Sequence, residues 1–153
     1  MRVKIEHRLG IQAPPDAIWA VIADIAGWPA WNPLYPRAEG VLRIGAPLVL
    51  DVALPGQKVR TIRPTVSDWV PNEQILWRLS MFGGLVTSTR YLEIEQLIDT
   101  GCIFSNGEMV EGLLGPRVAR RMRGALRAGF GAMGEAVKTR VEATWRPMPA
   151  PPT

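Results

Sequence analysis

Histidine and cysteine are almost missing from this sequence of 153 residues. Cys102 is the only cysteine, so a disulfide within the chain is impossible, and His7 is the only histidine. A zinc site and a catalytic triad built on histidine are therefore close to excluded, and no resident metal or cofactor is expected. Without a histidine to activate it, Cys102 is expected to be a small buried apolar side chain rather than a nucleophile.

Long hydrophobic runs are missing as well. No stretch of about 18 residues is free of charged side chains, and the opening residues mix charges with apolar side chains, unlike a signal peptide. No integral membrane segment is predicted, and the protein is expected to be soluble and cytoplasmic. A glycine-rich phosphate-binding motif is also absent, since Gly83-Gly84 is typical of a hairpin turn.

Positive charge is concentrated in one segment of the chain. The net charge is +4, and much of the excess lies at Arg117, Arg120, Arg121, Arg123 and Arg127. These arginines alternate with apolar residues at helical spacing, which predicts a buried stripe beside a solvated basic face. No basic groove with interleaved aromatic residues accompanies them, so nucleic-acid binding is not expected. An acidic partner or a membrane surface is the alternative use of this face.

The apolar residues change their period twice along the chain. Residues 2–11 predict a strand, and a pair of short helices follows as far as residue 31. From about residue 116 to residue 145 the period is helical again, and residues 146–153 form a proline-rich tail. The six segments in between alternate like strands, and turn residues separate them into consecutive hairpins. These segments are 35–44, 47–54, 58–69, 74–81, 85–97 and 101–112.

This order predicts an α+β protein with one curved antiparallel sheet of seven strands wrapped around the long C-terminal helix. An antiparallel sheet has one face that must be covered, and only the final helix is long enough to cover it. Residues 1–145 are expected to form one domain, because a chain of this length that is 47% hydrophobic can build one core. Glycines in the final helix indicate either a close approach to the sheet or room for a ligand beneath it. They are Gly124, Gly129, Gly131 and Gly134.

Two tryptophans lie on a stiff connector near the N-terminus. Pro14 and Pro15 are typical of a helix start, and the proline-punctuated turn that follows the helix holds Trp28 and Trp31. Aromatic rings dominate both protein cores and ligand cavities. The two rings therefore either pack in the core or, for at least one of them, line a cavity.

Several motifs occur in order along nearly the whole chain. They are Ala13-Pro14 with Ile18-Trp19, Asp24 with Trp28-Pro-Ala-Trp-Asn-Pro33, Arg63-Pro-Thr-Val66, Leu76-Trp77, Arg90-Tyr-Leu-Glu93, Gly107-Glu108, Gly112-Leu-Leu114 and Met133-Gly-Glu-Ala-Val-Lys138. Together they resemble the SRPBCC superfamily, also described as START-like or birch-pollen-allergen-like, and within it the polyketide cyclase/dehydrase-like branch of bacterial proteins. The resemblance implies a helix-grip fold with a hydrophobic cavity between helix and sheet. Similar proteins include lipid carriers, hormone receptors, cyclases and co-chaperones, so the resemblance does not select a function.

Alternation along the predicted strands assigns side chains to the inner face of the sheet. With Trp77 inward, Ile75 and Leu79 also point inward, while Thr89, Tyr91 and Glu93 on the next strand point outward. The inward residues on the next two strands are then Arg90, Leu92, Ile94, Cys102, Phe104, Asn106, Glu108 and Val110. The full set of predicted ligand-binding residues is Trp31, Asn32, Trp77, Arg90, Phe104, Asn106, Glu108, Val110, Met122 and Phe130, with no metal ligand among them.

Arg90 and Glu108 are the candidates for chemistry. They lie on adjacent antiparallel strands, where an ion pair is geometrically reasonable. Such a pair would orient a carboxylate or carbonyl of a ligand, or it would only hold the sheet together. Glu108 is also a candidate general base and Arg90 a candidate stabiliser of an enolate oxygen. These catalytic roles conflict with the ion pair unless a substrate separates the two side chains.

The favoured hypothesis is a binding or carrier protein for a small hydrophobic or amphipathic molecule. An apolar cavity with few polar groups supports this function without any catalytic constellation. The alternatives are a polyketide cyclase or dehydratase-like enzyme that uses Glu108, and a co-chaperone-like interaction module that uses the basic helical face. The identity of the ligand, the existence of a reaction and the formation of a homodimer stay open at this stage.

Overall fold

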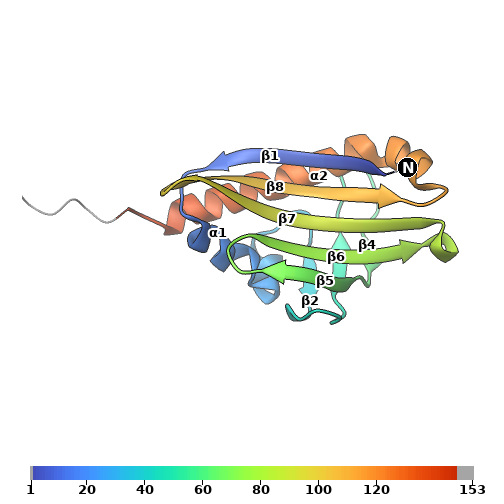
Figure 1. Cartoon of the computed structure of the whole chain (residues 1–153), viewed down its shortest axis with the longest axis horizontal. Coiled ribbons are helices and arrows are strands. Elements are labelled where there is room, and N and C mark those ends of the chain that lie inside the picture. The colour runs from blue at the N-terminus through green and yellow to red at the C-terminus, as the bar shows by residue number, and fades with distance from the viewer. Residues whose placement is uncertain (1, 148–153) are drawn as a thin grey trace, which may run out of the picture.

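A long helix lies along one face of a curved antiparallel sheet in the computed structural model, which describes residues 2–147 (Figure 1). The larger sheet contains, in spatial order, β1 (Val3–Ile11), β8 (Gly101–Glu111), β7 (Val86–Ile98), β6 (Gln74–Met81) and β5 (Thr65–Val70). A smaller antiparallel sheet contains β2 (Arg37–Glu39), β3 (Val49–Val52) and β4 (Arg60–Ile62). The helix is α2 (Gly115–Thr144). The predicted α+β helix-grip architecture is confirmed. Residues 148–153 of the predicted proline-rich tail lie outside the described residues.

Two short helices follow β1, as the sequence predicted. The first is α1 (Pro15–Ile22), and the second is a 3-10 helix, η1 (Ile25–Ala30). Proline at the start of α1 costs little, because the first N–H groups of a helix have no partner within the helix. Asp16 in the first turn places negative charge at the positive end of the helix dipole. A further one-turn 3-10 helix, η2 (Phe82–Gly84), connects β6 to β7.

Over residues 2–147 the structure has eight strands in two sheets, whereas the sequence predicted seven strands in one sheet. The predicted strand over residues 58–69 is divided into β4 and β5, because Pro64 between them has no N–H to donate to a strand ladder. β4 pairs with β3, and β5 pairs with β6 in the larger sheet. A bridge between Pro47 and Thr65, with a hydrogen bond from Val66 N to Ala46 O of 2.9 Å, connects the two sheets.

The predicted strand over residues 35–44 is reduced to the short β2. It ends at Gly40, whose φ of +131° is a backbone conformation that L side chains rarely adopt. A Cβ atom on Gly40 would also lie 2.6 Å from Leu48 Cδ2 and 2.8 Å from the carbonyl oxygen of Pro47. The chain therefore turns at Gly40 instead of continuing as a strand.

Glycines let α2 approach its neighbours closely over its middle part. A Cβ on Gly131 would lie 3.2 Å from the ring of His7, and one on Gly134 would lie 3.0 Å from Leu9 Cδ2. A Cβ on Gly129 would lie 2.8 Å from Leu54 Cδ2. These three positions support the first of the two explanations drawn from the sequence, that glycines let the helix pack closely against its neighbours. Gly124 differs, because a Cβ there would meet nothing within 4 Å.

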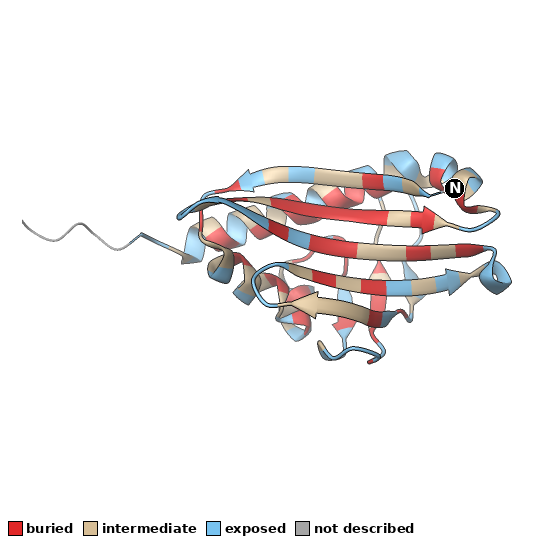
Figure 2. Cartoon of the chain, viewed as in Figure 1, coloured by how far each residue is buried: buried red, intermediate tan, exposed pale blue. Residues whose placement is uncertain are grey.

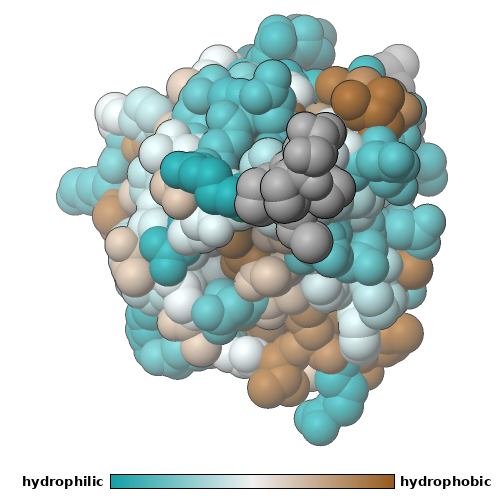
Figure 3. Space-filling model, turned by 90° about the vertical axis from the view of Figure 1, so that its left-hand side faces the viewer, coloured by the Kyte–Doolittle hydropathy of each residue, from teal (hydrophilic) through white to brown (hydrophobic). Residues whose placement is uncertain are grey.

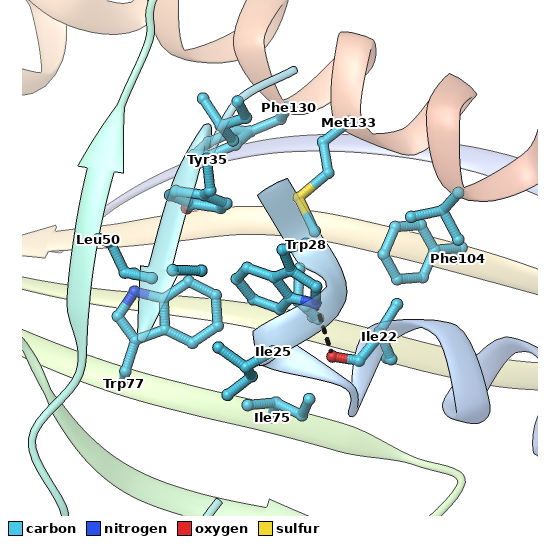
Figure 4. Packing of buried hydrophobic residues seen from close by; sticks show 14 of the residues in the cluster. Ile22, Ile25, Trp28, Tyr35, Leu50, Ile75, Trp77, Phe104, Phe130 and Met133 are labelled. Atoms are coloured by element: carbon cyan, nitrogen blue, oxygen red, sulfur yellow. Dashed lines mark hydrogen bonds between the residues drawn. The ribbon is translucent and has the colours of Figure 1, made fainter. Parts of the chain in front are cut away.

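Buried residues on the larger sheet, the smaller sheet, α1, η1 and α2 form one core, and Figure 2 marks their positions along the ribbon. Its central aromatic cluster contains Trp28, Tyr35 and Trp77 (Figure 4). The ring centroids of Trp28 and Tyr35 are 5.4 Å apart, and Trp77 lies 6.1 Å from each of them. Trp28 Nε1 donates a 3.1 Å hydrogen bond to Ile22 O, so the indole N–H is satisfied although the ring is buried. Trp28 is therefore a core residue.

The face assignment along β6, β7 and β8 agrees with the structure, with one difference in burial. Trp77, Leu92 and Phe104 are buried on the inner face. Tyr91 lies on the outer face, as predicted, but it is also buried. Its partner across the ladder is Gly107, which leaves room for the ring, and its hydroxyl donates a hydrogen bond to Glu6.

Among residues 2–147, no helix combines the length and the apolar character needed to cross a membrane.

Candidate functional site

A cavity of about 360 Å³ lies between the larger sheet, the smaller sheet and the N-terminal part of α2. This volume is in the range of pockets that hold small molecules. Most of the lining is apolar and comes from three directions. β6 contributes Trp77, Leu79 and Met81, α2 contributes Val118, Met122 and Leu126, and the smaller sheet with its turn contributes Val52, Leu54 and Ile62.

A polar group of three side chains lies at the sheet side of the cavity. Arg90 and Glu108 are directly opposite each other on β7 and β8. Arg90 Nε donates a 3.4 Å hydrogen bond to Glu108 Oε1, and their side chains are only 12% and 6% exposed. Ser88 Oγ donates a hydrogen bond to the same carboxylate oxygen. The carboxylate therefore accepts hydrogen bonds from two neighbours on β7.

The charge of Arg90 is stabilised from several sides. Its Nη1 donates a 3.0 Å hydrogen bond to Tyr35 Oη, and the guanidinium carbon lies 6.0 Å from the Tyr35 ring and 5.8 Å from the Phe130 ring. Burial opposes a charge on Arg90, yet its pKa is raised because the Tyr35 oxygen and the Glu108 carboxylate attract the cation. Burial raises the pKa of Tyr35, so its hydroxyl stays protonated at neutral pH. Arg90 and Glu108 thus form a hydrogen-bonded ion pair inside the protein.

The structure brings half of the predicted ligand-binding residues to the cavity. Trp77, Arg90, Glu108, Val110 and Met122 all line it. The first four follow from alternation along the strands, and Met122 follows from the helical period of α2.

The other predicted residues lie outside this cavity. Phe104 and Phe130 are buried in the core, and Asn106 Nδ2 donates a 3.5 Å hydrogen bond to Phe130 O. Asn32 Oδ1 accepts the backbone N–H groups of Leu34 and Tyr35, so its side chain shapes the turn after η1. Trp31 lines a separate hollow beside the C-terminal part of α2. Alternation predicts the face of the sheet on which a side chain lies, but not how far the cavity extends along that face. Near Gly131 and Gly134, α2 lies close against β1, and this part of the helix does not line the cavity.

Sequence reasoning missed several residues of the site. Ser88 lies two residues before Arg90 and shares its face, so the alternation used for Arg90 would have found it. Tyr35 reaches Arg90 from the turn after η1, and the sequence contains no local signal for that contact. Four cationic residues that line the cavity were also missed as a group, because they come from two distant segments. They are Lys58, Arg60, Arg117 and Arg121.

Cys102 has no surroundings that would activate a thiol. It is buried, burial raises its pKa, and its Sγ donates a 3.3 Å hydrogen bond to Ala13 O. In the part of the chain that the structure describes, no group of three or more histidine, cysteine, aspartate or glutamate residues could hold a metal ion.

Several solved structures share this architecture. An aromatase/cyclase from Streptomyces sp. R1128 matches with a TM-score of 0.74 and 21% identity, over 93% of this chain and 94% of that chain. A START superfamily protein from Mycobacterium smegmatis matches with a TM-score of 0.71 and 21% identity, over 92% and 97%. Norcoclaurine synthase from Thalictrum flavum, in complex with dopamine and hydroxybenzaldehyde, matches with a TM-score of 0.71 and 15% identity, over 96% and 90%. These likenesses show that the chain shares the fold of these three proteins.

The family of this chain follows from the sequence. The family model described as polyketide cyclase/dehydrase and lipid transport matches residues 2–142, and the chain belongs to that family. No curated protein matches the sequence significantly. The resemblance drawn from the motifs is thereby confirmed, and the family supports a role in binding or cyclising a small molecule.

Proposed function

We propose that this protein binds a small hydrophobic or amphipathic molecule in the cavity between the larger sheet and α2. The observation that carries the proposal is the cavity itself, which is about 360 Å³ in volume and lined mainly by apolar side chains. Burial of a ligand against such a lining is favourable by roughly 25 cal/mol for each Å² of apolar surface removed from water. A few polar groups at one side then fix the orientation of the ligand.

The Arg90–Glu108 pair favours binding over catalysis as the main function. Each of the two side chains already has hydrogen-bond partners inside the protein, and Arg90 holds a second contact to Tyr35. A ligand that only contacts the pair needs no rearrangement. A reaction that uses Glu108 as a base needs the ion pair to open first, at a cost.

The test is to identify a molecule that the protein retains and to show that it occupies the cavity. Native mass spectrometry of the protein purified from its own host, followed by extraction, is expected to detect a retained apolar ligand. Met122→Trp, which places an indole in the cavity, is expected to reduce retention at least about tenfold, equivalent to 1.4 kcal/mol. Arg123→Trp is the matched control, because Arg123 is the next residue on α2, is exposed and does not line the cavity.

Loss of retention in both tryptophan variants would assign the effect to the helix surface instead of the cavity. A protein that retains nothing and also fails to take up hydrophobic fluorescent probes would overturn the proposal.

A cyclase or dehydratase-like reaction is the second candidate function. The observation in its favour is that a buried carboxylate, Glu108, lines the same cavity beside a cation and a hydroxyl. Two of the solved structures with this fold are named as an aromatase/cyclase and as norcoclaurine synthase. The retained molecule, once identified, is to be incubated with wild type and with Glu108→Gln. Conversion by wild type and binding without conversion by Glu108→Gln would favour the enzyme, whereas no conversion by wild type leaves the carrier function.

A further inference from the structure

Four cationic residues that line the cavity are exposed, so they lie where the cavity opens to solvent. Lys58 and Arg60 come from the end of the β3–β4 hairpin, and Arg117 and Arg121 come from the first turns of α2. Glu108 is the only acidic residue of the lining, and it is buried and already paired with Arg90. The opening therefore carries positive charge that the lining does not neutralise.

None of the four cations forms an ion pair within residues 2–147. The hairpin end is held against the helix, because Gln57 Nε2 contacts Met122 Sδ at 3.7 Å. Gln57 is next to Lys58 and Met122 is next to Arg121, so this contact places the cations of the hairpin and those of α2 on neighbouring segments. Like charges brought together in this way repel one another unless an anion lies between them.

The beginning of α2 makes the charge at the opening still less favourable. Its first turn contains no acidic residue and no side-chain cap, so no carboxylate of the helix itself offsets the positive end of the dipole. Arg117 lies in that first turn, where a cation is disfavoured and an anion is favoured. The chain therefore presents an anion-attracting end of a helix, two arginines and two further cations beside an apolar cavity.

We propose that the ligand is an anionic amphiphile, with its apolar body in the cavity and one carboxylate, sulfonate or phosphate group at the opening between Lys58, Arg60, Arg117 and Arg121. The inference rests on the proposed function and names the chemical class of the ligand. Guanidinium groups are well suited to this role, because their fork of N–H donors matches the oxygens of carboxylates and phosphates. The proposal does not depend on the buried Arg90, since the charge of that side chain is already paired with Glu108 and two of its five N–H donors bind Glu108 and Tyr35.

A single amphiphilic molecule fits these observations better than a large anionic surface. The four cations line a cavity whose remaining lining is mainly apolar, so one anionic group and one apolar body are satisfied together. The exposed arginines at positions 120, 123 and 127 of α2 do not line the cavity. The opposite end of the molecule, around the C-terminal part of α2, mixes hydrophilic with apolar side chains (Figure 3).

The experiment compares two fluorescent probes that share one ring system. 1-Anilinonaphthalene-8-sulfonate carries a sulfonate, and N-phenyl-1-naphthylamine is its uncharged counterpart. The anionic probe is expected to bind at least about tenfold more tightly at low salt, a difference of 1.4 kcal/mol. Its affinity is expected to fall as NaCl is raised, because exposed charges are screened, while the affinity of the neutral probe stays nearly constant.

Substitutions at the opening test whether the positive charge there contributes to the affinity for the anionic probe separately from the apolar cavity. Arg60→Gln and Arg117→Gln are each expected to weaken the anionic probe about two- to fivefold, as for exposed ion pairs, with no change for the neutral probe. Arg123→Gln and Arg127→Gln remove the same charge from the same protein away from the opening. These control variants are expected to leave both affinities unchanged.

Other results of these experiments would overturn the anionic class of the ligand, or the proposed function as well. Equal affinity for the two probes, or equal losses in the control variants, would overturn the anionic class while leaving the proposed cavity function standing. Binding of neither probe by the folded protein would overturn both. Co-sedimentation with phosphatidylglycerol vesicles that depends on Arg123 and Arg127 as much as on Arg60 and Arg117 would assign the charge to a membrane surface and overturn the single-molecule proposal.

Discussion

Arg90 and Glu108 face each other across one rung of the β7–β8 ladder, with Nε of the arginine 3.4 Å from Oε1 of the glutamate. The pair lies in the floor of an apolar cavity, where an unpaired charge is expensive. Its two members are therefore linked: each one is tolerated in the interior because the other is present.

Removal of one member of this pair is expected to destabilise the protein strongly. Glu108→Ala leaves the Arg90 guanidinium without its carboxylate, which costs about 3–5 kcal/mol in buried pairs. Arg90→Met with Glu108→Leu removes both charges and is expected to lose much less than the sum of the two single substitutions. Urea denaturation of the single and double variants measures these free energies of unfolding. Strict additivity would show that the two charges do not depend on each other.

Gly107→Ala is expected to damage the outer face of the sheet. A Cβ at this position would overlap the hydroxyl of Tyr91 and lie 2.9 Å from the carbonyl oxygen of Ile5. Overpacking of this kind costs about 1–3 kcal/mol. Gly10→Ala is the control, because a Cβ there meets nothing within 4 Å. Thermal unfolding should show a lower midpoint temperature for Gly107→Ala than for wild type and Gly10→Ala. An unchanged midpoint temperature would contradict the packing described for Tyr91.

The glycines of α2 are expected to respond differently to alanine. Gly124→Ala should stabilise the protein by up to about 1 kcal/mol, because alanine is the better helix former and a Cβ at Gly124 meets nothing within 4 Å. Gly134→Ala should gain less or lose stability, since its Cβ would lie 3.0 Å from Leu9 Cδ2 and 3.3 Å from His7 Nδ1. Chemical denaturation of the two variants checks the order. An equal gain at both positions would mean that α2 does not need to approach β1 so closely.

Glu142 is expected to give the protein a small dependence on pH. A hydrogen bond from Lys138 and one from the backbone N–H of Gln12 lower the pKa of its carboxyl group. A lowered pKa in the folded state contributes stability above the ordinary glutamate pKa, and that stability is lost as the pH falls through the folded value. Glu142→Gln should therefore cost up to about 1 kcal/mol at neutral pH, in the range of exposed ion pairs.

The difference between Glu142→Gln and wild type should shrink as the pH falls below about 4.3, the ordinary glutamate value. Glu135→Gln, an exposed position on the same helix, serves as the control. A difference between wild type and Glu142→Gln that is the same at neutral and at acid pH would exclude the carboxylate charge as its cause.

The sequence predicted which residues of β6, β7 and β8 lie on the inner face of the larger sheet. Consecutive hairpins make β7 and β8 neighbours, and alternation from Trp77 places Arg90 and Glu108 on the inner face. Both predictions depend only on the alternation of residues within each strand and on the turns between consecutive strands. The strand count was wrong because Pro64 interrupts an otherwise continuous pattern, and a continuous pattern alone does not say which neighbour each half will join.

The extent of the cavity could not be predicted from the same periods. Phe104, Asn106 and Phe130 were expected in it, but they lie where the helix and the sheet are packed together. Tyr35 contacts Arg90 from a turn far away in the sequence. Such contacts depend on the distance between elements, and a hydrophobic period carries no information about that distance.

The close packing of α2 against β1 at Gly131 and Gly134 has a consequence for ligand size. All residues of α2 that line the cavity come before these glycines in the helix, so the cavity lies along the N-terminal half of α2. Larger side chains at these positions would lift the helix and lengthen the cavity. Residues that do not line the cavity therefore limit how far it extends along the helix.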